Sequence, residues 1–373
     1  MAPPALFASL AKNPEWAKFW SAAAQPYATF LVGIGAIIAA SLAFYNGERE
    51  RRQRGVHESD KAKRETKREL TERQSQLVAE LSNATPIIRE AAAHGLVALA
   101  EDWLAFGDDN QHRVCVSMLA TYLRTPMTDP GPQCPDVPVR GTIIRLISEL
   151  VERRGIKHYW RELNLRSVDL QYVSLVGLKM EEVWFDSANL TGADLSGADF
   201  TRSNFGQATL SECDMTATNF TGAMLQLATA RHANLRRTNF TKGALFGANF
   251  GRSYIIRERT EDDQKYYRSE DFISQAPLFN DAYLMGAMFA DADLSGVTFQ
   301  GARLEFADFT KARLYCANLA GAILKATNVE SANLTGATLV DSKIGPLTLI
   351  FNDDTRWPEG FEPPPAFTRM AVN

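Results

Sequence analysis

The sequence predicts a chain in two parts, a helical N-terminal part and a long C-terminal repeat domain that is neither plain helix nor plain sheet. The helical part is predicted by an uncharged apolar run from Phe19 to Gly47 and by the charged stretch after it. The repeat domain is predicted by large apolar residues at every fifth position, as in Leu190, Leu195, Phe200 and Phe205. A helix repeats its buried face about every 3.6 residues and a strand about every two, so a sustained period of five requires another architecture.

The apolar run predicts a transmembrane helix over residues 25–46. Its centre, Tyr27 to Tyr45, is 19 residues long and uncharged, and about 20 residues are needed to cross a hydrocarbon core. Basic residues are dense after the run and sparse before it, so the positive-inside rule places residues 1–24 outside and the bulk of the chain in the cytoplasm. We therefore expect a single-pass protein of the cell inner membrane that contacts the lipid bilayer through residues 27–45.

Two other interpretations of the apolar run remain open, a cleaved signal peptide and a buried core helix. The basic residues after the run argue against both, because translocating them is unfavourable and a core helix does not need them. Within the run, small residues recur at four-residue spacing at Gly35, Ala39 and Ala43. Such a row lets two membrane helices approach closely, so we expect this face to support a homodimer.

Residues 47–83 predict a charged helical spacer. They are rich in Arg, Lys, Glu and Gln, and acidic residues lie four positions before basic ones, as in Glu48 and Arg52. A coiled-coil seam would run through Leu70, Leu77 and Leu81. Lysines at the earlier seam positions favour a solvated helix over a coiled coil.

Residues 84–160 predict a small helical domain. One helix follows Pro86, a second lies in HRVCVSMLATYLR, and a third in GTIIRLISELVERR ends near Gly155. The proline-rich segment TPMTDPGPQCPDVP predicts a loop before the third helix. We expect this domain to join the spacer to the repeats and to cover the open end of the first repeat.

The period of five continues from Leu165 to Phe250 and resumes from Phe279 to Ile344. In most repeats the residue two positions before the large apolar one is small or slender. Residues twenty positions apart should then form interior columns, and one column contains Met180, Phe200, Phe220 and Phe240. If the residues after Ile255 are a single insertion, the same column continues at Phe279 and Phe299.

These repeats resemble the pentapeptide-repeat family, whose motif is A(D/N)LXX with a central Leu or Phe. ADLSG from Ala193, ADFTR from Ala198 and ANLTG from Ala332 match it outright. The resemblance implies an all-β solenoid, a right-handed quadrilateral β-helix with one pentapeptide on each side. It assigns residues 161–350 to this β-helix, after the transmembrane helix, the charged helical spacer and the small α-helical domain.

Residues 257–276, RERTEDDQKYYRSEDFISQA, interrupt the repeats and predict an inserted loop. A tolerated surface insertion and a functional loop are both open, and paired tyrosines flanked by charges favour a contact surface. The candidate partner-binding residues are Arg257, Arg259, Tyr266, Tyr267, Arg268 and Phe272. Residues 351–373 predict a C-terminal cap and tail, in which Trp357 and Phe361 cover the final coil.

The sequence predicts neither an enzyme nor a cofactor site. No nucleophile motif, phosphate loop or metal-ligand spacing occurs, and the cysteines Cys115, Cys134, Cys213 and Cys316 are far apart in the sequence. We expect free thiols in a reducing compartment. The expected function is a membrane-tethered, cytoplasm-facing interaction scaffold for an unidentified protein partner.

The resemblance also implies an alternative function. Some pentapeptide-repeat proteins mimic DNA, bind DNA gyrase and protect it from quinolones. Residues 165–255 contain eight acidic and eight basic residues, and residues 277–350 contain seven and five. A DNA mimic needs dense negative charge, so these counts favour the scaffold, and we expect no direct nucleic-acid binding.

Overall fold

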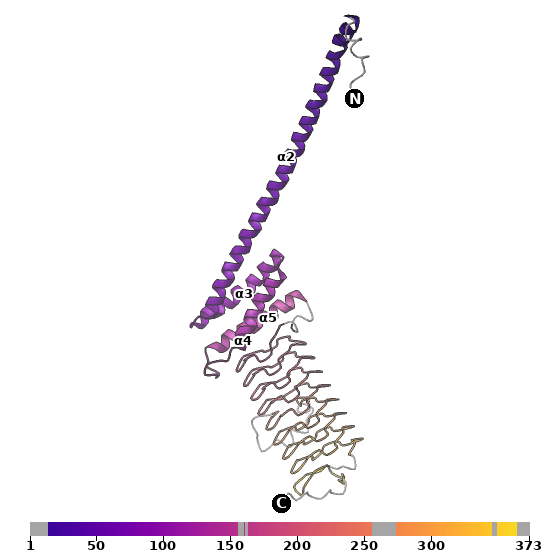
Figure 1. The fold of residues 1–373 in the computed structure, drawn as a ribbon. Helices are drawn as coiled ribbons and strands as arrows, with labels where there is room; N and C mark the ends of the chain where they lie inside the picture. Colours follow the sequence, from indigo (N-terminus) through magenta and orange to yellow (C-terminus); the bar gives the residue numbers. More distant parts are fainter. Residues whose placement is uncertain (1–13, 156–159, 161–162, 256–273, 345–348, 364–373) are drawn as a thin grey trace, which may run out of the picture. The chain divides into compact units, whose positions relative to one another are not determined.

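The computed structural model describes residues 14–155, 160, 163–255, 274–344 and 349–363 (Figure 1). Within the first helix, the side chains of residues 14, 16, 17, 19–29 and 31 lie outside the description. The chain divides into two compact units, Met1–Thr71 and Glu72–Asn373. Each unit is described by itself.

The first described helix, α2, runs over Pro14–Leu81 and contains the expected spacer. Two of the expected ion pairs form, between Arg52 and Glu48 at 2.6 Å and between Arg54 and Glu50 at 3.3 Å. Among the residues that can be assessed, no helix has the length and apolar character to cross a membrane. The transmembrane helix predicted for residues 25–46 therefore finds no support in this structure.

The end of α2 packs on the helical domain. Leu81 is buried, and a Cβ atom on Gly95 would lie 2.5 Å from Leu77 Cδ2, so glycine permits this close contact. Arg73 pairs with Asp102 at 2.8 Å. Leu77 and Leu81, two of the three residues of the predicted coiled-coil seam, therefore pack within the second unit. This packing accounts for both leucines without a coiled coil.

The helical domain contains α3 (Pro86–Phe106), α4 (Asp109–Arg124) and α5 (Asp136–Arg154). The helix ends follow the sequence signals, with Pro86 in the first turn of α3 and Gly155 in the left-handed conformation after α5. The predicted proline-rich loop is shorter than expected, because α5 begins at Asp136. Pro138 fits there because the first turn of a helix leaves its N–H groups without intrahelical partners.

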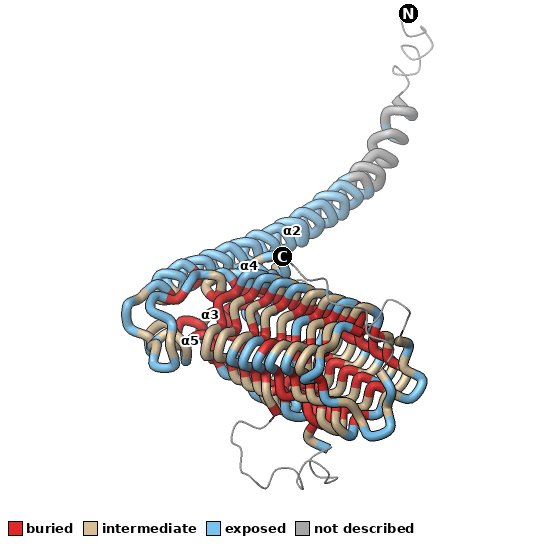
Figure 2. The backbone as a smooth tube through the Cα atoms, turned by 90° about the horizontal axis from the view of Figure 1, so that it is seen from below, coloured by how far each residue is buried: buried red, intermediate tan, exposed pale blue. Residues whose placement is uncertain are grey.

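The repeats form a four-sided solenoid of parallel bridges. Bridges join residues twenty positions apart, such as Asp169 with Asn189 and Asn189 with Thr209. The central Leu and Phe residues are almost completely buried, and buried residues recur along every coil (Figure 2). The all-β solenoid predicted from the repeats is confirmed.

The predicted register across the insertion is also confirmed. Asn239 pairs with Leu278, which is 39 positions later, and the regular spacing of twenty returns afterwards. The insertion therefore adds nineteen residues to one coil. Gln275 already belongs to the coil, since its carbonyl accepts a 2.7 Å hydrogen bond from the Arg237 N–H, and Ala276 is buried.

Each corner of the solenoid contains a residue with positive φ two positions after the central one. Many of these residues are not glycine, including Leu227 and Phe306 at φ 58° and 60°. Asp and Asn side chains support the corners. The Oδ1 atom of Asn189 accepts hydrogen bonds from the N–H of Thr191 at 3.2 Å and its hydroxyl at 2.8 Å. The central residues therefore face inward, and the residues beside them and at the corners form the surface.

Residues outside the repeats reach both ends of the solenoid. At the start, the N–H of Asp169 donates to the Leu123 carbonyl at 2.8 Å, and the Met127 N–H donates to the Asp169 carboxylate at 2.9 Å. At the other end, Trp357 lines the interior space together with Leu334 and Leu349. Its ring stacks on Phe361, with centroids 5.3 Å apart. The helical domain is therefore hydrogen-bonded to the first coil and Trp357 reaches the end of the interior, while the C-terminal cap over residues 351–373 stays a prediction.

Candidate interaction surface

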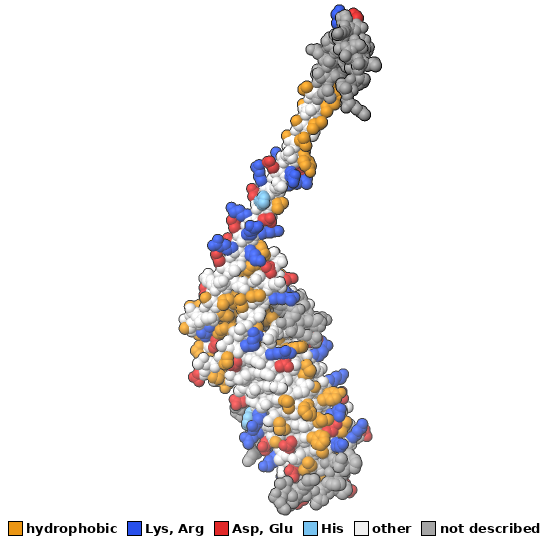
Figure 3. Space-filling view, viewed as in Figure 1, with side chains coloured by type: hydrophobic (Ala, Val, Ile, Leu, Met, Phe, Trp, Pro, Cys, Tyr) orange, Lys and Arg blue, Asp and Glu red, His pale blue; other side chains and the backbone are white. Residues whose placement is uncertain are grey.

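One side of the solenoid carries large apolar residues that point outward. We call them the apolar face, and they are Met224, Leu227, Phe246, Tyr283 and Phe306. Their exposed fractions range from 38% for Met224 to 60% for Phe306. Figure 3 shows hydrophobic side chains gathered on the surface of the coils. Such residues at outward positions mark a surface for another molecule, because contiguous apolar surface is rarely left to water.

The apolar face is continuous because the residues lie on successive coils. Met224 is bridged to Ala244, Ala244 to Tyr283, and Tyr283 to Arg303. Leu227 lies over the next coil, where its Cδ2 is 2.8 Å from the Cβ position of Gly247. The glycine leaves room for this leucine beside Phe246. The five residues therefore form a strip along the solenoid axis.

A charged pair borders the apolar face. Arg303 Nη2 lies 2.8 Å from Glu305 Oε1, and its guanidinium lies 5.8 Å from the centre of the Tyr283 ring. The Glu305 carboxylate raises the pKa of Arg303 through this hydrogen bond and its charge. Glu305 is buried, and its Oε2 atom has no hydrogen-bond partner within the described part of the chain. This oxygen is an acceptor at the edge of the strip.

The structure does not describe the contact residues that the sequence predicts. Residues 256–273 are outside the described structure, and they include all six candidates, namely Arg257, Arg259, Tyr266, Tyr267, Arg268 and Phe272. Gly35, Ala39 and Ala43 are exposed on α2, and a Cβ atom on Gly35 would meet nothing within 4 Å. The homodimer through this row stays a prediction.

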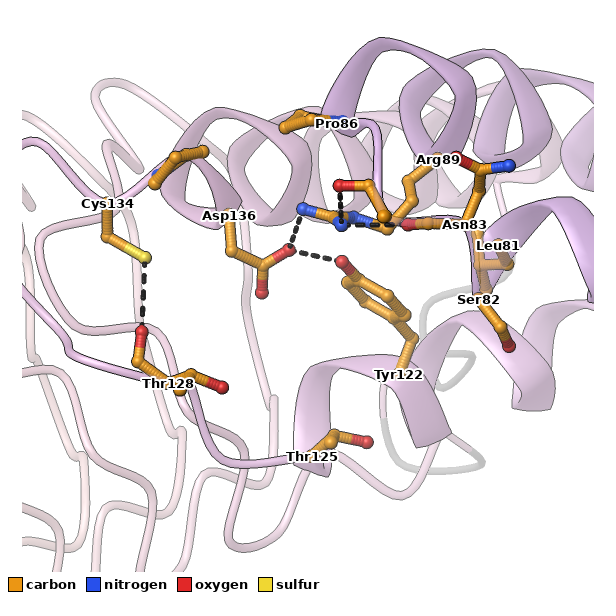
Figure 4. Close-up of a pocket in the computed structure, with 12 residues that line it drawn as sticks. Leu81, Ser82, Asn83, Pro86, Arg89, Tyr122, Thr125, Thr128, Cys134 and Asp136 are labelled. Carbon is orange, nitrogen blue, oxygen red and sulfur yellow. Dashed lines mark hydrogen bonds and ion pairs between the residues drawn. The ribbon is translucent and has the colours of Figure 1, made fainter.

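The second unit also contains a pocket of about 530 Å³ in the helical domain (Figure 4). It lies beside the starts of α3 and α5, and its lining includes Arg89, Tyr122 and Asp136. The Tyr122 hydroxyl donates a hydrogen bond to Asp136 Oδ1, which Arg89 Nη2 approaches to 3.2 Å. Burial and the Asp136 carboxylate raise the pKa of Tyr122, so the phenol stays protonated.

This polar cluster has a structural role. Arg140 Nε donates to Asp136 Oδ2 at 2.6 Å. Its other nitrogens donate to the carbonyls of Leu123, Thr125 and Asp169, at 2.9, 2.6 and 2.7 Å. A buried arginine whose hydrogen bonds are directed at three carbonyls and one carboxylate ties the helices to the first coil. The cluster therefore stabilises the junction between the helices and the first coil.

The described residues contain no cluster suited to a metal ion, and the buried Cys213 is poorly suited to thiolate chemistry. No group of three or more His, Cys, Asp and Glu residues there could hold a metal ion. Cys213 is buried and its Sγ lies 3.0 Å from the Leu190 carbonyl oxygen. Burial raises the pKa of the Cys213 thiol, which opposes formation of a thiolate. The absence of a cofactor stays a prediction.

The apolar face was not identified from the sequence, although its signal is present there. Each of its residues occupies an outward position of the five-residue frame, where polar residues such as Thr191 and Ser196 are common. Their adjacency appears only after the chain is stacked in steps of twenty, with one step of 39 between Ala244 and Tyr283. When the outward residues are grouped by column, the five residues of the apolar face fall together in one strip.

Comparison with known proteins matches the solenoid to one family. The model of pentapeptide repeats matches eight copies, in residues 180–216, 213–252, 278–314 and 312–344. No curated protein matches the chain.

Several solved structures are similar to parts of the chain. HetL, a pentapeptide repeat protein involved in heterocyst differentiation regulation from the cyanobacterium Nostoc, is 21% identical, with 58% of this chain and 93% of that chain covered and a TM-score of 0.18. A trypsin-treated form of QnrB1, a plasmid-mediated fluoroquinolone resistance protein, is 18% identical over 50% of this chain and 87% of that chain, with a TM-score of 0.28. A pentapeptide repeat protein from the Arabidopsis thaliana thylakoid lumen is 21% identical over 39% and 64%, with a TM-score of 0.15.

Proposed function

We propose that this chain, whose residues 180–252 and 278–344 are pentapeptide repeats, is a non-enzymatic protein-interaction scaffold tethered to the inner membrane and facing the cytoplasm. The observation that carries the proposal is the apolar face, an exposed strip on a solenoid whose interior is already filled. The partner is a protein with a complementary apolar surface.

The strip is energetically suited to binding. Burying a large apolar side chain contributes about 1.5–3 kcal/mol, and aromatic residues dominate the most important contacts of protein interfaces. Phe246, Tyr283 and Phe306 supply three such rings. The backbone beneath them is fixed by bridges to the neighbouring coils, so little conformational entropy is lost when a partner binds.

Two residues of the strip can be changed without disturbing the fold. Leu227 and Phe306 have positive φ, a conformation that asparagine tolerates better than leucine or phenylalanine. We expect the Leu227→Asn/Phe306→Asn variant to melt at or above the wild-type temperature while it loses partner binding by at least about tenfold. Lys311→Asn is the matched control, since Lys311 is an exposed corner residue with φ 58°.

The partner is first identified by proximity labelling and then purified. Its affinity is measured for the full-length wild type, the double variant and the Lys311→Asn control. Equal affinity of the wild type and the double variant would remove the apolar face from the proposal. The predicted role of the inserted residues is tested separately by deleting residues 256–274, which restores the spacing of twenty and should abolish partner capture if the inserted residues form the contact surface. Unchanged capture after deletion would assign binding to the coils alone.

The tether rests on the apolar run and its surroundings. Phe30, Ile37, Ile38, Leu42 and Phe44 are all exposed on α2, and arginines follow the run. An apolar helix surface next to cationic residues is stabilised by lipid, with the cations at anionic headgroups. We expect the chain to stay in the membrane fraction after an alkaline wash, with its C-terminus protected from protease in intact cells.

Ile37→Arg/Ile38→Arg should release the chain from the membrane fraction, because each charge is costly in hydrocarbon. Arg51→Gln, in the basic stretch, should not release it. A wild-type chain that washes off, or one that lacks its first ~45 residues when mature, would contradict the tether and favour a signal peptide.

The gyrase-binding alternative is tested by direct binding to purified DNA gyrase. The outward charges oppose it, since the repeats up to residue 255 carry equal numbers of acidic and basic residues. A DNA mimic needs negative charge along its length. Specific gyrase binding that duplex DNA displaces would favour this alternative over the scaffold.

A further inference from the structure

A single coil of the solenoid concentrates positive charge. Residues 225–244 contain four Lys and Arg residues and no Asp or Glu, a formal charge of +4. The two preceding coils, 185–204 and 205–224, each have a formal charge of −2. The near-neutral total of the repeats therefore conceals one strongly basic coil that follows two acidic ones.

The cations of this coil occupy consecutive corners. We call them the basic belt, and they are Arg231, Arg236, Arg237 and Lys242. Arg237 and Lys242 are corner residues with φ 57° and 58°, and His232 at φ 58° occupies the corner before them. All four cations are exposed. Because successive corners face different directions, the belt passes around the solenoid instead of lying on one face.

In the described part of the chain the belt differs from several other cations of the coils, which form ion pairs. Arg202 lies 3.3 Å from Glu182, Arg303 lies 2.8 Å from Glu305, and Arg313 lies 3.7 Å from Asp293. Within the described residues, no side chain of the belt forms an ion pair. Four exposed cations that have no ion-pair partner among the described residues lie on one coil, where they can contact an anionic ligand.

The geometry points to an acidic, extended polypeptide segment of a partner protein, and we propose that the basic belt binds it. Such a segment can follow the coil around its corners and cross the solenoid at right angles to its axis. It would then avoid Glu212 and Asp214 on the coil before and Asp291 on a later coil. Arginine favours this ligand because its planar guanidinium binds carboxylates in a bidentate manner.

Other polyanions fit the belt less well. Duplex DNA lying along the solenoid would meet the two acidic coils that precede the belt, and the chain has a formal charge of −4 overall. A flat anionic membrane cannot touch three corners of one coil at once. The proposal rests on the scaffold function proposed above, but it uses a surface other than the apolar face.

The test uses the full-length protein and a fluorescent oligoglutamate peptide of about twelve residues. Ten positions separate His232 from Lys242, so an extended peptide of this length follows the same part of the coil. We expect binding in low salt that weakens as salt rises, because exposed charge pairs are screened. The Arg236→Gln/Arg237→Asn/Lys242→Asn variant should bind at least about tenfold more weakly.

The matched control is the triple variant Lys311→Asn/Lys325→Gln/Lys343→Gln, which removes three exposed charges from other coils. This control should bind the peptide as tightly as the wild type does. Leu227→Asn/Phe306→Asn should also bind the peptide normally, which separates failure of the belt from failure of the apolar face. The proposal is overturned if the wild type does not bind oligoglutamate, or if the belt variant binds it equally well. Tighter binding to duplex DNA or to phosphatidylserine vesicles than to the peptide also overturns it.

Discussion

Phe220 lies in the middle of a stack of aromatic rings whose members are distant in the sequence. Its ring centre is 5.4 Å from that of Phe200 and 5.1 Å from that of Phe240. The planes of Phe220 and Phe240 differ by only 2°. The step of twenty residues per coil imposes this stacking, since each ring projects inward from the same side of its coil.

We predict that Phe220→Ala lowers the free energy of unfolding by about 3–5 kcal/mol, because the cavity cannot collapse between rigid coils. Phe220→Leu should cost less than about 1.5 kcal/mol, since Leu319 fills the same column and is buried. Chemical denaturation followed by circular dichroism measures both. Equal loss in the two variants would show that the ring stack, and not the filled volume, stabilises the coils.

His112 makes the helical domain sensitive to acid. Burial lowers the pKa of His112 below its ordinary value of 6.5, although its Nδ1 lies 2.8 Å from the Ala100 carbonyl oxygen. The unfolded chain then binds a proton more readily than the folded one below about pH 6.5. The stability contribution of His112 is complete above that pH and is lost as the pH falls toward the lowered pKa.

We predict that the melting temperature of the wild type falls between about pH 7.5 and about pH 5.5 by more than that of His112→Gln. Melting followed at 222 nm at both pH values measures the difference. His94→Gln is the control, because His94 is an exposed histidine of the same domain. A parallel decrease in all three proteins would assign the acid sensitivity to other groups.

At the scale of elements, the register of the coils limits how the insertion can be removed. Phe240 stacks on Phe279 with ring centres 4.7 Å apart, so the column crosses the insertion without interruption. The bridge from Asn239 to Leu278 spans 39 positions, and only a deletion of nineteen residues restores twenty. The predicted loop 257–276 contains twenty residues, one more than this count.

We predict that deleting residues 256–274 leaves the melting temperature within a few degrees of the wild type. Deleting residues 257–276 should lower it strongly, because the register slips by one position and Phe279 no longer faces the interior. It also removes Ala276, which is buried. Equal melting of the two deletion variants would show that the coils do not depend on this register.

The sequence predicted the elements to different degrees. The interior of the solenoid was predictable because one rule, a large residue at every fifth position, applies from Leu165 onward. The start of α5 was not, because the prolines before it suggested a loop and Pro138 is tolerated only in the first turn of a helix. The engagement of Leu77 by Gly95 depends on how α2 meets α3, which a local pattern does not contain.

At the scale of the whole molecule, the solenoid separates stability from recognition. Interior residues are fixed by the five-residue rule, so recognition is confined to outward positions, and there the apolar face and the basic belt stand out. Both were missed from the sequence, because the total charge and the average outward residue conceal them. They appear when the outward residues are assigned to coils and columns.

Site-specific photocrosslinking in living cells can show whether the apolar face binds a partner protein. A photoreactive amino acid at position 246 replaces a half-exposed phenylalanine, and the same group at position 311 serves as the comparison. Binding through the apolar face predicts one discrete crosslinked protein from position 246, which disappears when Leu227→Asn/Phe306→Asn is added, and none from position 311. The same products from both positions, or no product from position 246, would contradict it.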